Sequence, residues 1–130
     1  MEYITLNNGN ICPVIGIGTF MLGPADAENS VREALKMGYT LVDTANAYVN
    51  ERAVGRGIKE SGVKREDIFL STKLWPSEYE NENAVDETLE RLGVDYVDLL
   101  YHTRENAPSI GAAGLHRMGG DESRFFLMNR

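Results

Sequence analysis

Hydrophobic and polar residues along this chain alternate between two spacings, one typical of helices and one typical of strands. Residues 27–37 place Val31, Ala34 and Leu35 on one helical face and charged residues on the other, and Gly38 follows as a stop. Two further segments show the same spacing and each ends at a glycine; Asn50 can cap the first of them. The pattern predicts three amphipathic helices, over residues 27–37, 51–61 and 83–92.

Short apolar runs lie between these helices and are typical of buried strands. The strands are predicted over residues 14–18, 39–42, 68–72 and 96–101. Because strands and helices alternate, they predict an α/β fold with a parallel sheet and right-handed crossovers. Ahead of them, Asn8-Gly9 separates two apolar runs and predicts a β-hairpin, because both residues tolerate positive φ.

The pattern changes after residue 102. Residues 103–130 show neither the strand period nor the helix period, and several glycines interrupt them. We therefore divide the chain into a domain of strand–helix units, residues 1–102, and an irregular tail, residues 103–130, to which no structure is assigned.

Polar residues stand at the ends of the predicted strands, namely Thr19, Asp43, Lys73 and His102. The gaps between them are 24, 30 and 29 residues, which is close to one strand–helix unit each. One such unit returns the chain to the same end of a parallel sheet, so the four side chains are expected together. Barrel enzymes and open α/β sheets both carry their active sites at that end.

Asp43, Lys73 and His102 form, with Tyr48, a candidate set for acid catalysis. A buried lysine needs a carboxylate partner, which Asp43 can supply. A nearby ammonium favours a tyrosinate and lowers the pKa of a tyrosine from about 10 toward working pH. Tyr48 can then protonate a carbonyl oxygen as hydride arrives, and His102 can hydrogen-bond the same oxygen. Each residue alone also fits a plain structural role, as a cap, a packed ring or a solvated charge.

The composition of the chain limits the kinds of binding partner and compartment to be expected. The net charge of −7 argues against nucleic acid or an anionic membrane as the main partner, because both attract positive surfaces. No apolar run approaches the ~20 residues of a membrane helix, and the N-terminus lacks a signal-peptide pattern. The single cysteine, Cys12, favours a reducing compartment. We expect a cytoplasmic protein without a metal site, since no His/Cys cluster has ligand spacing.

Several motifs, in order, resemble those of one enzyme family. Residues 43–55, Asp-Thr-Ala-Asn-Ala-Tyr-Val-Asn-Glu-Arg-Ala-Val-Gly, are similar to the aldo-keto reductase signature. Residues 71–75, Ser-Thr-Lys-Leu-Trp, resemble the lysine strand of that family, and residues 16–20 resemble the exit of its first strand. The leading hairpin is similar to the one that closes the barrel bottom. The resemblance covers about residues 2–101.

The resemblance implies a fold, a reaction and a site. The fold is a partial (β/α)8 TIM barrel, with about the first four βα units preceded by a β-hairpin. The reaction is the NADPH-dependent reduction of a carbonyl compound, with Tyr48 as general acid, Lys73 tuning it and Asp43 pairing with Lys73. The resemblance implies cofactor contacts from Gly18, Thr19, Phe20 and Asp43. It implies substrate contacts from Phe20, Tyr48 and Trp75, to which the strand-end pattern above adds His102.

Two features depart from the family pattern. A complete barrel needs about 250 residues, so this chain is expected to be truncated, and its activity impaired. The family's histidine usually stands five residues after the strand aspartate, whereas His102 stands four after Asp98. The codons of His102-Thr103-Arg104 can be written so that another frame gives His-Gln, so the tail is expected to be frameshifted or disordered.

Alternatives to a reductase remain open at this point. The chain can be a half-barrel that self-associates through its open edges as a homodimer, or a non-catalytic remnant. A defined dimer would favour the first, and saturable NADPH binding would oppose the second.

Overall fold

The computed structural model describes residues 1–102 and the backbone of residues 125–126. Within that part it contains two sheets, three α-helices and three short 3-10 helices. In chain order the elements are β1 (Tyr3–Thr5), β2 (Ile11–Pro13), β3 (Gly16–Gly18), α1 (Pro24–Lys36), β4 (Leu41–Asp43), η1 (Asn46–Tyr48), α2 (Glu51–Ser61), η2 (Arg65–Asp67), β5 (Phe69–Leu74), η3 (Pro76–Glu78), α3 (Ala84–Leu92), β6 (Leu99–His102) and β7 (Phe125–Phe126).

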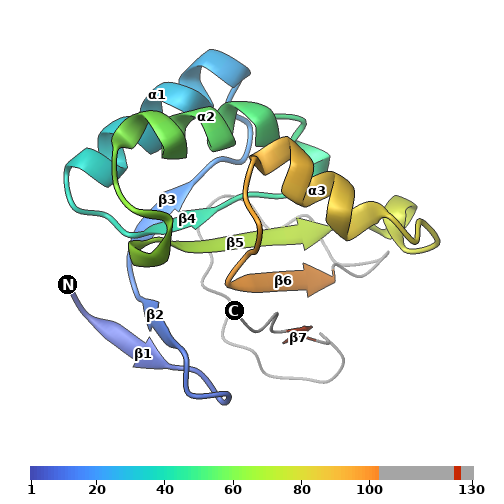
Figure 1. Ribbon diagram of the computed structural model, residues 1–130, viewed down its shortest axis with the longest axis horizontal. Helices are drawn as coiled ribbons and strands as arrows, with labels where there is room; N and C mark the ends of the chain where they lie inside the picture. The colour runs from blue at the N-terminus through green and yellow to red at the C-terminus, as the bar shows by residue number, and fades with distance from the viewer. Residues whose placement is uncertain (103–124, 127–130) are drawn as a thin grey trace.

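The larger sheet follows the order of the chain. Strands β3, β4, β5 and β6 are parallel neighbours, which confirms the predicted alternation of strands and helices. Helices α1, α2 and α3 all lie on one face of this sheet (Figure 1). Hairpin β1–β2, also as predicted, forms its own antiparallel sheet on the side where β3 to β6 begin (Figure 1).

The outer strand β7 was not predicted from the sequence. It pairs antiparallel with β6, with Leu100 opposite Phe126. The rest of the predicted irregular tail lies outside the described residues. Among the described residues, no helix is both long and apolar enough to cross a membrane.

Helix boundaries follow local signals closely. Proline stands in the first turn of α1, where its missing N–H costs nothing. Gly62 and Gly93 end α2 and α3 with φ of 74° and 66°, a left-handed conformation that glycine adopts without strain. The predicted helix stops are therefore confirmed, and α1 begins three residues earlier than the predicted residue 27, at Pro24.

Helix α2 lies close to both neighbouring helices because two of its positions lack side chains. A Cβ added at Gly57 would lie 2.6 Å from the carbonyl oxygen of Glu28 in α1. A Cβ added at Gly55 would lie 2.2 Å from the carbonyl oxygen of Leu92 in α3. Both distances are far inside van der Waals contact, so glycine sets how closely the three helices pack.

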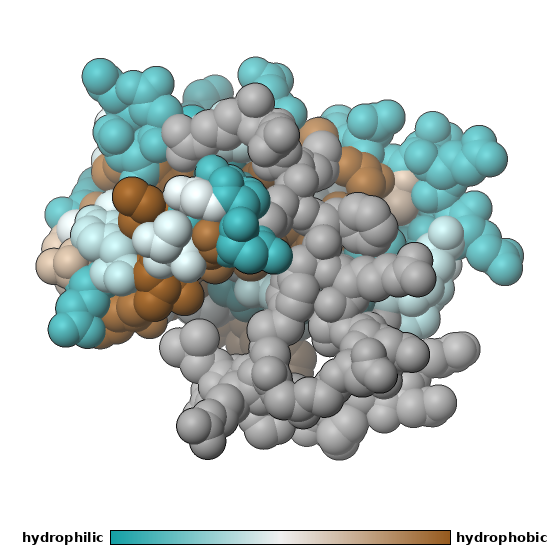
Figure 2. Space-filling model, turned by 90° about the horizontal axis from the view of Figure 1, so that it is seen from below, coloured by the Kyte–Doolittle hydropathy of each residue, from teal (hydrophilic) through white to brown (hydrophobic). Residues whose placement is uncertain are grey.

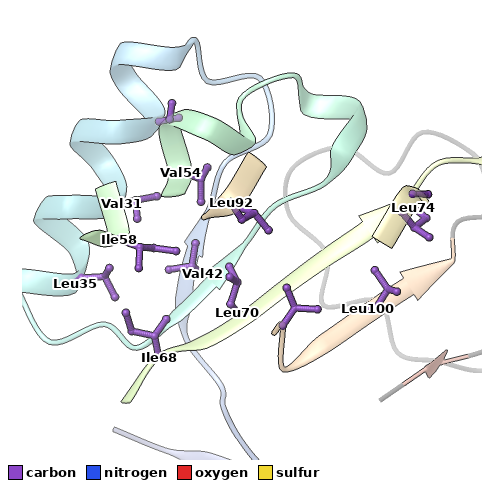
Figure 3. Packing of buried hydrophobic residues seen from close by; sticks show 14 residues of the cluster. Val31, Leu35, Val42, Val54, Ile58, Ile68, Leu70, Leu74, Leu92 and Leu100 are labelled. Atoms are coloured by element: carbon purple, nitrogen blue, oxygen red, sulfur yellow. The ribbon is translucent and has the colours of Figure 1, made fainter. Parts of the chain in front are cut away.

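The hydrophobic core lies between the helices and the sheet (Figure 3). Val31 and Leu35 of α1 and Val54 and Ile58 of α2 point toward Val42 of β4, and all are buried. Alternate residues of each strand point to opposite faces of a sheet, so the strand residues between the core residues face away from the helices. In β5 this second set includes Ser71 and Lys73.

A buried ion pair joins the beginnings of β5 and β6. Asp98 Oδ2 accepts hydrogen bonds from Arg65 Nη2 at 2.8 Å and from the Leu70 N–H at 2.9 Å. The Asp98 N–H donates to the Leu70 carbonyl at 2.8 Å. The predicted strand 96–101 therefore begins later, at Leu99, because its first residues form this cluster and not the regular ladder.

The hairpin carries much of the exposed hydrophobic surface. Tyr3, Ile4 and Ile11 are exposed, as is Ile15 just after it. Figure 2 views the molecule from the side opposite the helices and shows hydrophobic residues among hydrophilic ones where the hairpin lies. This surface has no partner within the described part of the chain.

Candidate active site

A partly buried ion pair between Lys73 and Asp43 lies at the ends of β4 and β5, on the face of the sheet away from the helices. Lys73 Nζ donates to Asp43 Oδ2 at 2.6 Å and to the Thr44 carbonyl at 2.9 Å. Ser71 Oγ donates to the other Asp43 oxygen. The ammonium is thus held between a carboxylate and a carbonyl, and within residues 1–102 its third donor has no acceptor.

Tyr48 lies beside this pair and follows β4 through η1. Its ring centroid is 5.2 Å from Lys73 Nζ and 5.1 Å from the ring of Phe20. Tyr48 is partly exposed, and Phe20 is exposed over nearly half its surface. Two βα loops and the end of strand β5 therefore bring a phenol, an aromatic ring and an ammonium to one open end of the sheet, as the strand-end pattern predicted for Asp43 and Lys73.

Thr19, predicted as a cofactor contact, has its side chain turned into the protein. Its side chain is buried, with the hydroxyl 2.9 Å from Thr44 Oγ1 and 3.2 Å from the Asp43 carbonyl oxygen. Its N–H also donates to that carbonyl, at 3.0 Å. Thr19 therefore holds the β3–α1 loop against β4, while the neighbouring Gly18 has open space where a side chain would be.

Trp75 stands at the rim of the site, directly after β5. Its side chain is half-exposed, and its backbone N–H donates to Asn46 Oδ1 at 3.0 Å. This bond ties the β5 exit to η1, the 3-10 turn that carries Tyr48. The predicted substrate residues Phe20, Tyr48 and Trp75 are thus on loops that the structure brings to the same end of the sheet.

His102, at the end of β6, lies on the opposite face of the sheet from Lys73. In the parallel register of β5 and β6, Lys73 pairs with Tyr101, and Leu74 pairs with His102. Paired residues point to the same face, so His102 shares the face of the core residue Leu74. Its ring stacks on that of Tyr79, with centroids 5.1 Å apart.

Tyr101 is the β6 residue paired with Lys73 and shares its face of the sheet, and the sequence interpretation did not include it among the site residues. Its ring centroid is 5.8 Å from Lys73 Nζ. Burial, and then the negative charge of Asp43, raise the pKa of Tyr101 to about 12. Tyr101 therefore stays a neutral phenol at ordinary pH, close to Lys73.

Further polar residues of the site were also missed, chiefly Ser71, Thr44, Asn46 and Asn50. Asn50 was predicted as a helix cap, but its side chain makes no capping bond to α2. Its Nδ2 donates instead to the carbonyls of Thr19 and Leu22, across the site. These partners are 31 and 28 residues away along the chain, so no local pattern indicates them.

The arrangement can support proton transfer to a carbonyl oxygen. It offers an accessible phenol, an adjacent ammonium held by a carboxylate, and exposed aromatic surface for an apolar ring or chain. Within the described residues, no group of three or more His, Cys, Asp or Glu side chains could hold a metal ion.

Comparison with known proteins gives one consistent family. The family model described as "Aldo/keto reductase family" matches residues 14–107. Glycerol 2-dehydrogenase (NADP(+)) of Saccharomyces cerevisiae is 52% identical over 99 residues, which are 75% of this chain and 32% of that protein. An aldo-keto reductase of Mycolicibacterium smegmatis is 43% identical over 125 residues, 94% of this chain and 40% of that protein.

A solved structure shares the fold as well. The aldo/keto reductase from Brucella melitensis matches with a TM-score of 0.73 and 46% identity, over 76% of this chain and 39% of that one. Its match agrees with the fold expected from the sequence, a partial TIM barrel with a leading hairpin. The chain thus spans about two fifths or less of the length of the proteins it matches.

Proposed function

Because the chain belongs to the aldo/keto reductase family, we propose that it serves the NADPH-dependent reduction of an aldehyde or ketone to an alcohol. The observation that carries the proposal is the position of Lys73 Nζ, bound by Asp43 and Thr44 and 5.2 Å from the ring of Tyr48. The NADP(+)-dependent name of the yeast relative supports the choice of cofactor. The lone Cys12 supports a reducing compartment such as the cytoplasm.

In this mechanism Tyr48 is the general acid. Its hydroxyl gives a proton to the carbonyl oxygen while the carbonyl carbon accepts a hydride, so that an alcohol forms and a phenolate remains. The Lys73 ammonium stabilises that phenolate by its charge, and Asp43 keeps the ammonium in place. Tyr48 then recovers a proton from solvent, which reaches its partly exposed side chain.

The described residues fit the nicotinamide end of the cofactor. Gly18 leaves open space in front of the loop, and Phe20 offers a half-exposed ring beside Tyr48. We assign Gly18, Phe20 and Asp43 to cofactor contact, and Thr19 to holding the loop that presents them. When bound, the nicotinamide supplies the hydride.

The substrate end of the site is formed by Phe20, Tyr48 and Trp75. The exposed ring of Phe20 lies against the phenol, and the exposed ring of Trp75 follows β5 at the same end of the sheet, so a carbonyl compound with an apolar or aromatic part fits best. His102 was expected to orient the carbonyl oxygen. Its side chain shares the face of Leu74, so we leave that task to Tyr48 and the Lys73 ammonium.

The test is Tyr48→Phe, which removes the hydroxyl and keeps the ring on Phe20. NADPH oxidation with glyceraldehyde as the probe substrate should fall by about 10²-fold or more, the usual worth of a positioned acid. NADPH affinity should stay within about twofold, followed through Trp75, the single tryptophan of the chain. Tyr39→Phe, at an exposed tyrosine before β4, is the matched control.

Two outcomes separate the alternatives. Unchanged turnover in Tyr48→Phe would show that another group is the acid. A wild-type chain that shows neither turnover nor a saturable change in Trp75 fluorescence with NADPH would favour the non-catalytic remnant.

A further inference from the structure

Two residues beside the site adopt a backbone conformation that their side chains disfavour. Met21 has φ of 59° and Val49 has φ of 56°, and they are the non-glycine residues with positive φ in the described part of the chain. Valine is branched at Cβ, which makes a left-handed conformation especially costly. Both side chains are 85% exposed, so their own packing does not impose this conformation. Something else must hold the two loops.

Asn50 connects both strained positions. It directly follows Val49, and its Nδ2 donates to the carbonyls of Thr19 at 2.9 Å and Leu22 at 3.0 Å, on either side of Met21. Its Oδ1 lies 3.4 Å from Thr44 Oγ1, which in turn contacts the Thr19 hydroxyl. The side chain is buried, so the amide has exchanged water for these partners.

The loops tied by Asn50 carry the two aromatic rings of the site. Phe20 lies between the two carbonyls that Asn50 binds, and Tyr48 lies two residues before Asn50. The contact between the Phe20 and Tyr48 rings, at 5.1 Å, therefore depends on how these loops are held.

We propose that Asn50 is a positioning residue that holds the β3–α1 and β4–α2 loops in strained conformations and thereby sets Phe20 against Tyr48. The effect of Asn50 on catalysis rests on the proposed function, whereas its effect on the contact between the two rings does not. A role as helix cap is not available to explain Asn50, because its side chain makes no capping bond to α2.

The decisive variant is Asn50→Asp in the full chain. It keeps the size and the acceptor, and places a carboxylate oxygen against the carbonyls of Thr19 and Leu22. Proton–proton contacts between the rings of Phe20 and Tyr48, measured by NMR, should disappear while the far-ultraviolet circular dichroism spectrum is retained. If the wild-type chain reduces glyceraldehyde, kcat should fall roughly tenfold to hundredfold with a smaller change in KM.

Asn81→Asp is the matched control. Asn81 also donates two side-chain hydrogen bonds from Nδ2, to Glu78 and Glu87, outside the site. It should leave the ring contacts and kcat as in the wild type. Asn50→Ala serves if Asn50→Asp does not fold, and adding Met21→Gly to it should restore part of the ring contact, because glycine adopts positive φ without being held.

The readouts distinguish this proposal from the proposed function. Retained ring contacts in both Asn50 variants would overturn the positioning role, whatever the activity. Lost contacts in those variants support it even where the wild-type chain shows no turnover, and that absence would count against the proposed function alone. Failure of Met21→Gly to restore any contact would also overturn the strained-loop account.

Discussion

Replacing Asp98 by alanine should destabilise this protein far more than its position outside the site suggests. The side chain is 4% exposed, and its partner Arg65 is 20% exposed. Asp98 Oδ2 is the acceptor for both Arg65 Nη2, at 2.8 Å, and the Leu70 N–H, at 2.9 Å. Removal leaves a mostly buried cation without its charge partner and a buried amide without its acceptor.

The magnitude follows from these two losses. Removing one partner of a buried ion pair costs about 3–5 kcal/mol, and an unsatisfied buried N–H about 1–3 kcal/mol. The two overlap, because one oxygen serves both donors. Arg65 also keeps hydrogen bonds to the carbonyls of Ile68 and Tyr96 and lies over the Tyr96 ring. We expect a net loss of about 3 kcal/mol, a large part of the 5–15 kcal/mol typical of a domain.

Urea unfolding followed by circular dichroism measures this loss. With an m-value of about 1–3 kcal/mol/M, the midpoint should fall by roughly 1–3 M. Asp95→Ala, at an exposed aspartate of the same loop, is the control and should change stability by less than about 0.5 kcal/mol. A second variant, Asp98→Leu with Arg65→Leu, removes both charges and should be less destabilised than Asp98→Ala.

A mild effect would refute the reasoning. If Asp98→Ala unfolds at the same urea concentration as Asp95→Ala, the buried pair does not hold the start of β6. The same result would bear on the site. The bonds between Asp98 and Leu70 stand at the start of the β5–β6 pairing, which further along sets Lys73 opposite Tyr101.

Three further predictions concern helix packing, alkaline stability and assembly. Gly55→Ala should lower the free energy of unfolding by roughly 2 kcal/mol, because its Cβ would clash with the Leu92 carbonyl oxygen. The control Gly23→Ala, where a Cβ meets open space, should leave stability unchanged. Equal melting temperatures of the two variants would contradict this reasoning. The folded state keeps the proton of Tyr101 up to pH about 12, whereas an unfolded tyrosine loses it near pH 10, so stability should fall as pH rises through that window. Tyr101→Phe should flatten the fall in melts between pH 9 and 12, and an unchanged slope would exclude burial as its cause. Finally, the alternative of a homodimer through the open sheet edges predicts a defined dimer in sedimentation equilibrium. Ile4→Lys tests whether the exposed residues of hairpin β1–β2 add to that interface, and an unchanged balance of dimer and monomer would show that they do not.

The sequence predicted those parts of the fold that depend on neighbouring residues. Gly62 and Gly93 end helices because each adopts positive φ, and the Asn8-Gly9 pair lies in the hairpin turn. Asp43 and Lys73 were expected to meet because each ends, or nearly ends, a parallel strand. That inference needs only the strand–helix repeat, and the ion pair between them confirms it.

The remaining features depend on contacts between distant segments. The strand-end rule failed to bring His102 to Lys73, because a position in a strand also has a facing direction, which the register of β5 and β6 decides. The bonds of Asn50 to the β3–α1 loop and of Asp98 to Arg65 join residues 28 to 33 positions apart. Local patterns of hydrophobic and polar residues do not predict such pairs.

The sequential order of β3, β4, β5 and β6 has a consequence for synthesis. Strands β4, β5 and β6 each pair with the strand made just before, and helices α2 and α3 each pack beside the helix made just before. A ribosome releases about 5–20 residues per second, which is slow compared with local folding. We therefore expect each strand–helix unit to settle onto the preceding ones as it leaves the exit tunnel. The Asp43–Lys73 pair would then form once residues up to β5 have emerged.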